Sequence, residues 1–273
     1  MVIYPNVSAL MAIYHKDSPD YLRTALESLE NQTWQIQEYI LVIDGLINSS
    51  LDDVIQDFQR TNNVVIVRQE KNVGLAKALQ NGLKHASNEL ILRADADDIS
   101  VSNRLEAEFS FIINHTNFGA VGSYVAEFDS DPQFVNSVRT VPVESEDIKK
   151  FAQLRSPMNH PSVLLRKSAV ERAGGYIDFE KLEDYHLWVR MILNDIVLAN
   201  IPEPLVLMRA GDGMYKRRGG FKYLKGYFNL RKTFVDWGFT TKRTEFIADI
   251  GMLINVLIPN RIRSTFYRIF LRN

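Results

Sequence analysis

Short apolar runs alternate with longer amphipathic segments along the first third of the chain. Runs of Val, Ile and Leu predict buried strands at residues 7–13, 39–43, 64–67 and 90–92. Apolar residues at helical spacing predict helices between them, from Pro19 with Ser18 as its N-cap, over residues 51–58 and over residues 73–86. Apolar strands separated by helices are typical of a parallel sheet covered on both faces, so we expect an α/β fold.

The pattern changes past residue 115. It predicts a strand pair over residues 118–128, a strand over 161–165, and a strand or hairpin over 196–208 that Pro202 and Pro204 interrupt. Helices are predicted over residues 144–154 and 182–193, and a basic helical segment begins at residue 219. The chain has no internal repeat and no Gly/Ser linker. We therefore expect one α/β domain, residues 1–218, followed by a helical C-terminal extension, residues 219–273.

Charge is distributed unevenly along the chain. Residues 1–202 hold 18 Lys and Arg against 28 Asp and Glu, whereas residues 203–273 hold 14 against 5. This division indicates an acidic body and a basic C-terminal part that faces something anionic. Residues 259–273 carry four arginines, no carboxylate and an apolar face at helical spacing. The tail is predicted either to contact an anionic membrane surface or to pack its apolar face on the domain.

The composition excludes several classes of site. The chain of 273 residues has no cysteine, which excludes disulfides, thiolate metal sites and cysteine nucleophiles. The longest apolar stretch, residues 246–258, contains Asp249 and is shorter than the ~20 apolar residues that span a bilayer. The N-terminal residues lack the basic start and the long apolar stretch of a secretory signal. We expect a cytoplasmic protein, which would be peripheral on the inner face of the cytoplasmic membrane if its basic tail contacts that surface.

Three carboxylates crowd the end of the fourth predicted strand, in the sequence Asp95-Ala96-Asp97-Asp98. Carboxylates this close repel one another and are costly to bury together unless a divalent cation such as Mg²⁺ or Mn²⁺ binds between them. In open α/β sheets, ligands bind at this end of the strands. An EF-hand is excluded because Ile and Ser occupy its fifth and sixth positions, and a phosphatase Asp-x-Asp would follow the first strand. A metal–diphosphate site and a solvated turn that caps the next helix both remain open.

A second acidic group, Glu183-Asp184, opens the predicted helix over residues 182–193. One of these carboxylates could act as a general base beside a metal–diphosphate site. The helix dipole also stabilises carboxylates in a first turn, by about 0.3–1 kcal/mol each, so simple capping explains the pair nearly as well. His186 could serve as the base, but a histidine beside Trp188 on a helix is more often structural.

A glycine precedes the predicted third helix in the sequence Asn72-Val73-Gly74, and Lys77 lies one turn inside that helix. Free backbone N–H groups with a nearby cation suit an anionic or nucleotide ligand. The spacing matches neither a P-loop nor Gly-x-Gly-x-x-Gly. A simple turn into a helix therefore explains this segment equally well.

Cations and glycines alternate in residues 209–220, which include Arg209, Lys216, Arg217 and Arg218. Glycines between cations are typical of a flexible segment that binds phosphate. With the acidic cluster elsewhere in the chain, we interpret this segment as a lid that neutralises a departing diphosphate. A solvated basic turn is the alternative.

Taken together, residues 7–220 resemble the family 2 glycosyltransferases, which have the GT-A nucleotide-diphospho-sugar transferase fold with a Rossmann-like, mixed but mainly parallel sheet. The resemblance depends on the order and spacing of Ile13-Tyr14, Val42-Ile43-Asp44-Gly45, Asn72-Val73-Gly74-Leu75-Ala76, Asp95-Ala96-Asp97-Asp98 and Glu183-Asp184. The segment Asn159-His160-Pro161-Ser162-Val163 and residues 209–220 are similar to bacterial enzymes that build O-antigen or capsule repeat units on a lipid carrier. The family commonly has Asp-Asp-Gly-Ser after its second strand. Here Ile43-Asp44-Gly45-Leu46 departs from it, so the resemblance is weaker at the nucleobase contact than at the metal.

The resemblance implies an inverting, metal-dependent transfer of a hexose from a nucleotide-diphospho-sugar to a hydroxyl of a glycan or lipid-linked saccharide. UDP is the family's commonest donor nucleotide. Asp184 would be the catalytic base, and Glu183 would orient the acceptor or the base. The remaining roles fall into three groups: Mn²⁺ or Mg²⁺ at Asp97, Asp95 and Asp98, with Asp95 also near the ribose; the nucleobase at Tyr14 and Asp44; and the diphosphate at Arg209, Lys216, Arg217 and Arg218. No nucleic-acid partner is expected.

Two other classes stay open. A sugar-1-phosphate nucleotidyltransferase shares the sheet architecture, but it normally has a Gly-rich, Arg-containing loop just after the first strand. This chain has Tyr14-His15-Lys16-Asp17 there, which argues against that class. A non-catalytic polysaccharide-binding protein would not need the acidic cluster, the acidic pair and the basic segment together.

Overall fold

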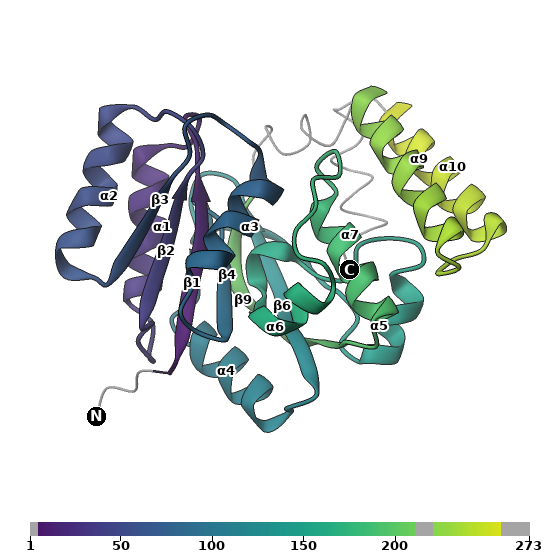
Figure 1. Ribbon diagram of the computed structural model, residues 1–273, viewed down its shortest axis with the longest axis horizontal. Coiled ribbons are helices and arrows are strands. Elements are labelled where there is room, and N and C mark those ends of the chain that lie inside the picture. The colour runs from purple at the N-terminus through teal and green to yellow at the C-terminus, as the bar shows by residue number, and fades with distance from the viewer. Residues whose placement is uncertain (1–4, 211–220, 258–273) are drawn as a thin grey trace.

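The first four predicted strands are present and form the parallel part of one nine-stranded sheet (Figure 1). The computed structural model describes residues 5–210 and 221–257. The four strands are β1 (Val7–Ile13), β2 (Glu38–Ile43), β3 (Val64–Arg68) and β4 (Leu90–Ala94). They lie in the order β3-β2-β1-β4. The chain moves outward from β1 to β3 and then returns past β1 to β4, so the winding reverses between β1 and β4. Such a reversal opens a crevice at the carboxyl ends of the two strands.

Helices cover both faces of this parallel part, as predicted. One face is covered by α1 (Pro19–Glu30), α2 (Ser49–Thr61) and α4 (Arg104–Asn114). Their apolar side chains share one core with every second residue of β1, such as Met11 and Ile13. Helix α3 (Leu75–His85) packs on the opposite face, against Leu10 of β1. Successive residues of a strand point to opposite faces, so an all-apolar strand contributes to both cores. Ser18 precedes α1 as its N-cap residue, but its side chain makes no capping hydrogen bond.

The second half of the sheet is mixed. Strand β8 (Leu164–Arg166) lies antiparallel between β4 and β6 (Phe118–Phe128), and β9 (Val197–Arg209) runs parallel to β6. Two short strands complete the sheet: β5 (Ile99–Ser100) pairs with β9, and β7 (Val135–Arg139) pairs with β6. The predicted α/β class with a mixed sheet is confirmed.

Two local predictions for this half were wrong in detail. Residues 118–128 form one long strand rather than a strand pair. The segment 161–165 begins as a 3-10 helix, η1 (His160–Ser162), before β8. Of the two alternatives predicted for residues 196–208, the structure has the strand, β9, whose register against β6 slips by two residues between Ile201 and Pro204. A bulge of this kind places Pro202 outside the hydrogen-bonded ladder, which a proline cannot join as a donor.

Three further helices contribute side chains to the core on the face of the sheet that α3 covers. They are α5 (Ser145–Phe151), α6 (Lys167–Arg172) and α7 (Glu183–Leu193). Leu187, Trp188 and Met191 of α7 join the core that contains α3 and α6. The predicted helices over residues 144–154 and 182–193 are therefore confirmed, with slightly shorter bounds for the first.

The predicted C-terminal extension is helical in its described part. Helices α9 (Phe221–Asp236) and α10 (Lys242–Leu257) form an antiparallel pair beside α7 at one end of the molecule (Figure 1). Tyr227, Leu230 and Phe234 of α9 share a core with Tyr185 and Val189 of α7. The proposed boundary between residues 218 and 219 and the basic tail 259–273 lie outside the described residues. No helix in the described part of the chain is long and apolar enough to cross a membrane.

Candidate functional site

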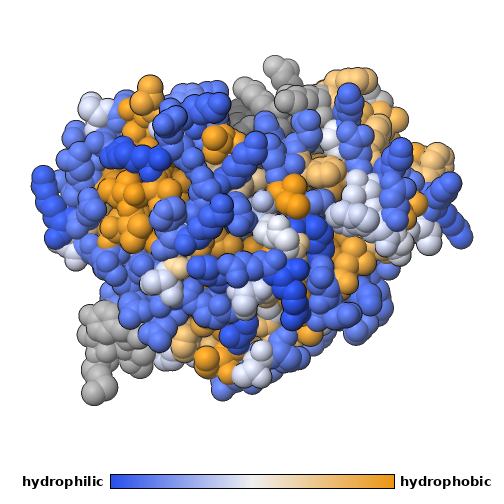
Figure 2. All heavy atoms as spheres, in the orientation of Figure 1, coloured by the Kyte–Doolittle hydropathy of each residue, from blue (hydrophilic) through white to orange (hydrophobic). Residues whose placement is uncertain are grey.

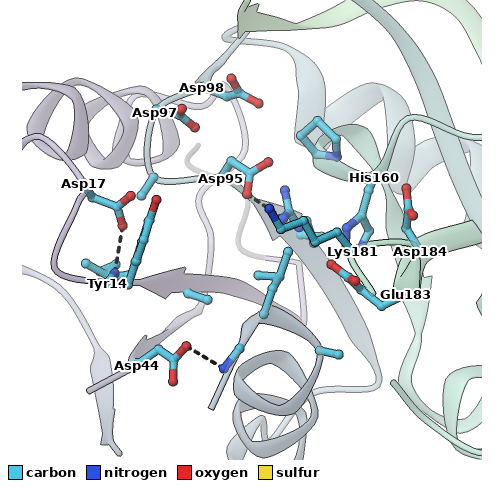
Figure 3. Close-up of a pocket in the computed structure, with 18 of the residues that line it drawn as sticks. Tyr14, Asp17, Asp44, Asp95, Asp97, Asp98, His160, Lys181, Glu183 and Asp184 are labelled. Carbon is cyan, nitrogen blue, oxygen red and sulfur yellow. Dashed lines mark hydrogen bonds and ion pairs between the residues drawn. The ribbon is translucent and has the colours of Figure 1, made fainter. Parts of the chain in front are cut away.

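A cavity of about 500 Å³ lies where the winding of the sheet reverses. Its walls come from the carboxyl ends of β1, β2 and β4, from the first turn of α3 and, opposite them, from the N-terminal end of α7 (Figure 3). Nine of the predicted site residues line it: Tyr14, Asp44, Asn72, Asp95, Asp97, Asp98, Glu183, Asp184 and Arg209. The fold therefore brings together motifs that lie up to about 200 residues apart in sequence.

The acidic cluster forms one wall of the cavity. Asp95, Asp97 and Asp98 each place a carboxylate oxygen within 4.8 Å of the other two. Asp98 is buried, and burial, together with the charges of Asp95 and Asp97, raises its pKa well above the usual range. A divalent cation with oxygen ligands would relieve both the repulsion and the cost of burial. The three carboxylates thus fit a magnesium or manganese site.

The cluster is held in place by β9. The backbone N–H of Arg209 donates to Asp98 Oδ1 at 2.9 Å. Its guanidinium donates to the backbone carbonyls of Asp97 and Asp129 and lies over the rings of Tyr21 and Phe128, at 3.7 and 4.6 Å from their centroids. Arg209 therefore lines the cavity, as predicted, and also fastens the acidic loop to the second half of the sheet.

Arg93 is a site residue that the sequence analysis missed. Its side chain is 2% exposed at the end of β4, and Nη2 forms an ion pair with Asp95 Oδ1 at 2.5 Å. Among the described residues, Nε and Nη1 have no hydrogen-bond partner. Burial of a guanidinium with two unsatisfied donors costs free energy unless nearby negative charges compensate its positive charge. Here the compensating charges are the carboxylates of the acidic cluster. The apolar run before Asp95 contained an arginine, and that interruption was the available signal.

Asp44 fixes the loop that leads into α3. Its Oδ1 accepts from Val73 N–H at 2.7 Å and its Oδ2 from Gly74 N–H at 3.0 Å. The side chain of Asn72 donates to the Asp44 carbonyl at 3.2 Å. Gly45 has φ +89°, and a Cβ there would lie 2.6 Å from Asn72 N, so only glycine fits. Asp44 thus shapes the cavity floor in addition to its predicted contact with the nucleobase.

Tyr14 lies at the carboxyl end of β1, across the cavity from α7 (Figure 3). Its backbone N–H donates to Asp17 Oδ2 at 2.8 Å, which fixes the turn that follows the strand. Asp17 also lines the cavity and was not predicted. An aromatic ring at this place offers a stacking surface for a planar ligand group.

The acidic pair opens α7 on the opposite wall. Burial, together with the charge of Asp184, raises the pKa of Glu183 to about 7. Asp184 is partly exposed, and its Oδ1 accepts from Tyr185 N–H at 2.7 Å. Two adjacent carboxylates in different environments can carry different protonation states, as acid–base catalysis requires. Figure 3 shows both side chains facing the same cavity as the acidic cluster.

Two histidines have different places. His160 lines the cavity, lies 3.0 Å from the Tyr176 hydroxyl, and has its pKa lowered well below the usual range by burial and by Arg93. It is therefore uncharged at neutral pH. His186 stacks on Phe179 at 4.7 Å between ring centroids and does not line the cavity. Burial lowers its pKa to about 4. The interpretation of His186 as structural fits this packing.

In the described part of the chain, one predicted site residue, Lys77, is not in the cavity wall. Lys77 is exposed on α3 and is absent from the lining. Ala76 rather than Lys77 lines the cavity, and α3 begins at Leu75, two residues later than predicted. Lys216, Arg217 and Arg218 lie outside the described residues, so the lid stays a prediction.

Lys181 is a further cation that the sequence analysis missed. It lines the cavity just before the acidic pair, and its backbone has φ +69°. A left-handed lysine is uncommon, and such residues occur most often where the surrounding structure serves a function. Nothing in the sequence around residue 181 predicts this conformation, since glycine is the usual residue there.

The fold is that of the GT-A transferases. S. aureus TarS aligns with a TM-score of 0.65 at 14% identity over 98% of this chain, which spans 46% of the TarS chain. A shorter TarS structure, residues 1–349 in complex with UDP-GlcNAc, aligns with a TM-score of 0.62 at 15% identity, over 98% of this chain and 72% of that one. The mannosyltransferase PcManGT from Pyrobaculum calidifontis, in complex with GDP-Man and Mn²⁺, gives 0.61 at 14% identity, over 96% and 83%.

The chain belongs to glycosyl transferase family 2, whose family model matches residues 8–173. It is 35% identical, over 98% of its length and 97% of the relative's, to the Escherichia coli UDP-Gal:alpha-D-GlcNAc-diphosphoundecaprenol beta-1,3-galactosyltransferase. It is 36% identical, over 82% of its length and 83% of the relative's, to the amylovoran biosynthesis glycosyltransferase AmsE of Erwinia amylovora. An uncharacterised glycosyltransferase of Haemophilus influenzae is 36% identical over 97% and 98%. The predicted family and its likeness to bacterial surface-polysaccharide enzymes are confirmed.

Proposed function

We propose that this glycosyltransferase is an inverting, metal-dependent enzyme that moves a hexose from a UDP-sugar to a hydroxyl of a glycan or lipid-linked saccharide. The observation that carries the proposal is that the acidic cluster and the acidic pair line one cavity from opposite walls. In-line displacement needs the leaving group and the base on opposite sides of one carbon. Family membership favours glycosyl transfer over nucleotidyl transfer and over non-catalytic binding.

The donor would lie along the ends of β1, β2 and β4. Tyr14 offers a stacking surface for the nucleobase, and Asp44 and Asn72 line the floor beside it. A UDP donor is supported by the names of the E. coli relative and of the TarS complex, which specify UDP-Gal and UDP-GlcNAc.

Asp97, with Asp95 and Asp98, would hold Mn²⁺ or Mg²⁺ beside the donor diphosphate. When bound, the cation supplies Lewis-acid stabilisation of the leaving diphosphate. The PcManGT complex with Mn²⁺ supports this assignment for the fold. The ion pair between Arg93 Nη2 and Asp95 Oδ1, at 2.5 Å, restrains this carboxylate at the edge of the cavity.

Asp184 would be the general base. It removes the proton of the acceptor hydroxyl as that oxygen attacks the anomeric carbon, and the bond from this carbon to the diphosphate breaks on the opposite face, which inverts the configuration. Glu183, whose pKa is raised to about 7 by burial and by Asp184, is substantially protonated at neutral pH. A protonated Glu183 can donate a hydrogen bond, which suits its proposed role of orienting the acceptor or the base.

The acceptor would be lipid-linked. The E. coli relative is named for an acceptor on diphosphoundecaprenol, which supports a lipid-linked saccharide here. The basic tail, residues 259–273, would then contact the inner face of the cytoplasmic membrane. The enzyme would then transfer its sugar at the cytoplasmic side of the membrane, in surface-polysaccharide synthesis.

Calorimetric titration of UDP, with and without Mn²⁺, tests the donor and metal sites. We expect Mn²⁺-dependent binding by the wild-type chain and loss of the Mn²⁺-dependent part in Asp97→Ala, by about tenfold or more in affinity. Asp53→Ala is the matched control, because Asp53 is exposed on α2 away from the cavity. Equal binding by Asp97→Ala and the control, or no UDP binding by folded wild-type protein, would overturn the proposal.

A further inference from the structure

Helix α10 exposes an apolar face. Phe246, Ile247, Ile250, Leu253 and Ile254 are between 40% and 65% exposed. They are five of the sixteen large hydrophobic side chains exposed in the described part of the chain, although α10 has only 16 residues. At 100° per residue these five positions share one side of the helix. Figure 2 shows hydrophobic side chains at the surface over α9 and α10, at the upper right of the view.

Cations lie at the N-terminal end of this face. Lys242 and Arg243 stand four and three residues before Phe246, so both are its neighbours on the helix surface. The two carboxylates of α10 lie off the face. Glu245 and Asp249 are half-buried, and Asp249 interacts electrostatically with Arg231 of α9. The exposed face of α10 is thus apolar with a positive end and no carboxylate.

We infer that the exposed face of α10 docks on a bilayer that contains anionic lipid. Apolar side chains beside Lys and Arg are the combination that enters the headgroup region of such a bilayer. The chain continues from α10 with 16 residues that hold four arginines and no carboxylate, which adds attraction to the same surface. A second copy would cover the apolar side chains, but its own α10 face has no carboxylate to meet Lys242 and Arg243, so it fits less well than an anionic surface.

The place of α10 in the fold connects this surface to the site. Helix α10 packs on α9, and α9 packs on α7, whose first turn carries Glu183 and Asp184. Tyr223 of α9 lines the cavity itself. Docking through α10 would therefore hold the wall of the cavity that carries the proposed general base at a fixed place relative to the membrane. A lipid-linked acceptor resides in that membrane.

Vesicle sedimentation of the full chain tests this surface. We expect binding to vesicles of phosphatidylethanolamine with phosphatidylglycerol, weaker binding at high salt, and little binding to phosphatidylcholine. Phe246→Glu/Ile250→Glu should lower the partition coefficient by about tenfold or more, because two apolar side chains no longer enter the interface. The matched control is Ile113→Glu on α4, which lies at the bottom of the view in Figure 1, away from α10; Ile113 is 48% exposed.

Three results would overturn the inference. These are no binding of the wild-type chain to anionic vesicles, equal binding by the double variant and the wild type, or a wild-type dimer that the double variant converts to a monomer. The inference deepens the proposed use of a lipid-linked acceptor, but the assay contains neither donor nor acceptor. UDP titration of the same double variant therefore separates the docking surface from the proposed function. A double variant that binds UDP but not vesicles is folded, has an intact donor site and has lost only the docking surface.

Discussion

Glu183 and Asp184 are neighbours in sequence, yet their environments differ in the way that a division of roles requires. Glu183 is buried in the wall of the cavity, whereas Asp184 is partly exposed at its surface. Burial penalises the charged form of a carboxylate, so the negative charge of the pair is favoured on Asp184. This contrast supports the proposed assignment of Asp184 as the base.

Substitution of the two carboxylates should therefore have unequal effects. Asp184→Asn should lower the transfer rate by roughly 10²–10⁴-fold, because the base is lost, and should leave UDP affinity nearly unchanged. Glu183→Gln should cost much less, because the amide resembles the protonated acid that is already substantially populated near pH 7. Initial rates and UDP titrations of both variants provide the measurement. An equally inactive Glu183→Gln would show that Glu183 acts in its ionised form.

At the scale of elements, α4 supports the acidic loop from behind. Arg104 at its start donates to the Arg93 carbonyl at 2.8 Å, to Ser100 Oγ at 3.1 Å and to Glu108 Oε1 at 3.0 Å. Both Arg104 and Glu108 are fully buried. Burial raises the pKa of Glu108 to about 7, although Arg104 acts in the opposite direction. The helix thus joins β4 and β5 on either side of the acidic cluster through one buried charge pair.

This pair predicts a pH dependence of stability. The folded state holds a proton on Glu108 up to about pH 7, whereas the unfolded chain releases it near the ordinary value of 4.5. Between these two pH values the folded state therefore binds more protons than the unfolded chain. The contribution of Glu108 to the free energy of unfolding consequently falls as pH rises from about 4.5 to 7. Glu108→Gln should flatten this slope in urea unfolding at several pH values. Glu106→Gln, on the same helix but partly exposed, is the control; equal slopes in the wild type and Glu108→Gln would contradict the assignment.

The same buried pair predicts that Arg104→Met is strongly destabilising. Removal of one partner of a buried ion pair costs about 3–5 kcal/mol, because the other charge stays buried without compensation. Here Glu108 can take up a proton, so the loss should be smaller at pH 6 than at pH 8. Urea unfolding of Arg104→Met at the two pH values measures this difference. A loss that is the same at both values would show that Glu108 is not the group left uncompensated.

At the scale of the whole molecule, the parallel half and the cavity motifs could be predicted, because each depends on local pattern. Apolar runs predicted β1 to β4, and the acidic cluster at the end of β4 was expected to form a ligand site because ligands bind at this end of the strands in open α/β sheets. The mixed half depends on pairings between distant segments, so β5, β7 and the bulge at Pro202 were not predicted. Arg93 and Lys181 were missed for a related reason: burial and a left-handed backbone arise only when α7 and the sheet come together.

The C-terminal helices were predicted as an extension, but their packing makes them part of the folded body. Tyr185 and Val189 of α7 pack on Leu230 and Phe234 of α9. Arg231 of α9 donates to the Tyr185 hydroxyl at 3.0 Å. The helix that carries the proposed base therefore has one face on the sheet core and the other on α9.

A chain that ends at residue 220 should consequently fold poorly, whereas a chain that ends at 257 should fold like the full protein. Loss of α9 exposes the apolar side chains of α7, and each fully buried one contributes about 1.5–3 kcal/mol. Several such losses compare with the ~5–15 kcal/mol that stabilises a typical domain. Thermal unfolding and UDP titration of the two shortened chains measure the difference. A chain ending at 220 that unfolds cooperatively at the full protein's temperature and binds UDP would show that the α/β domain is independent of its helical extension.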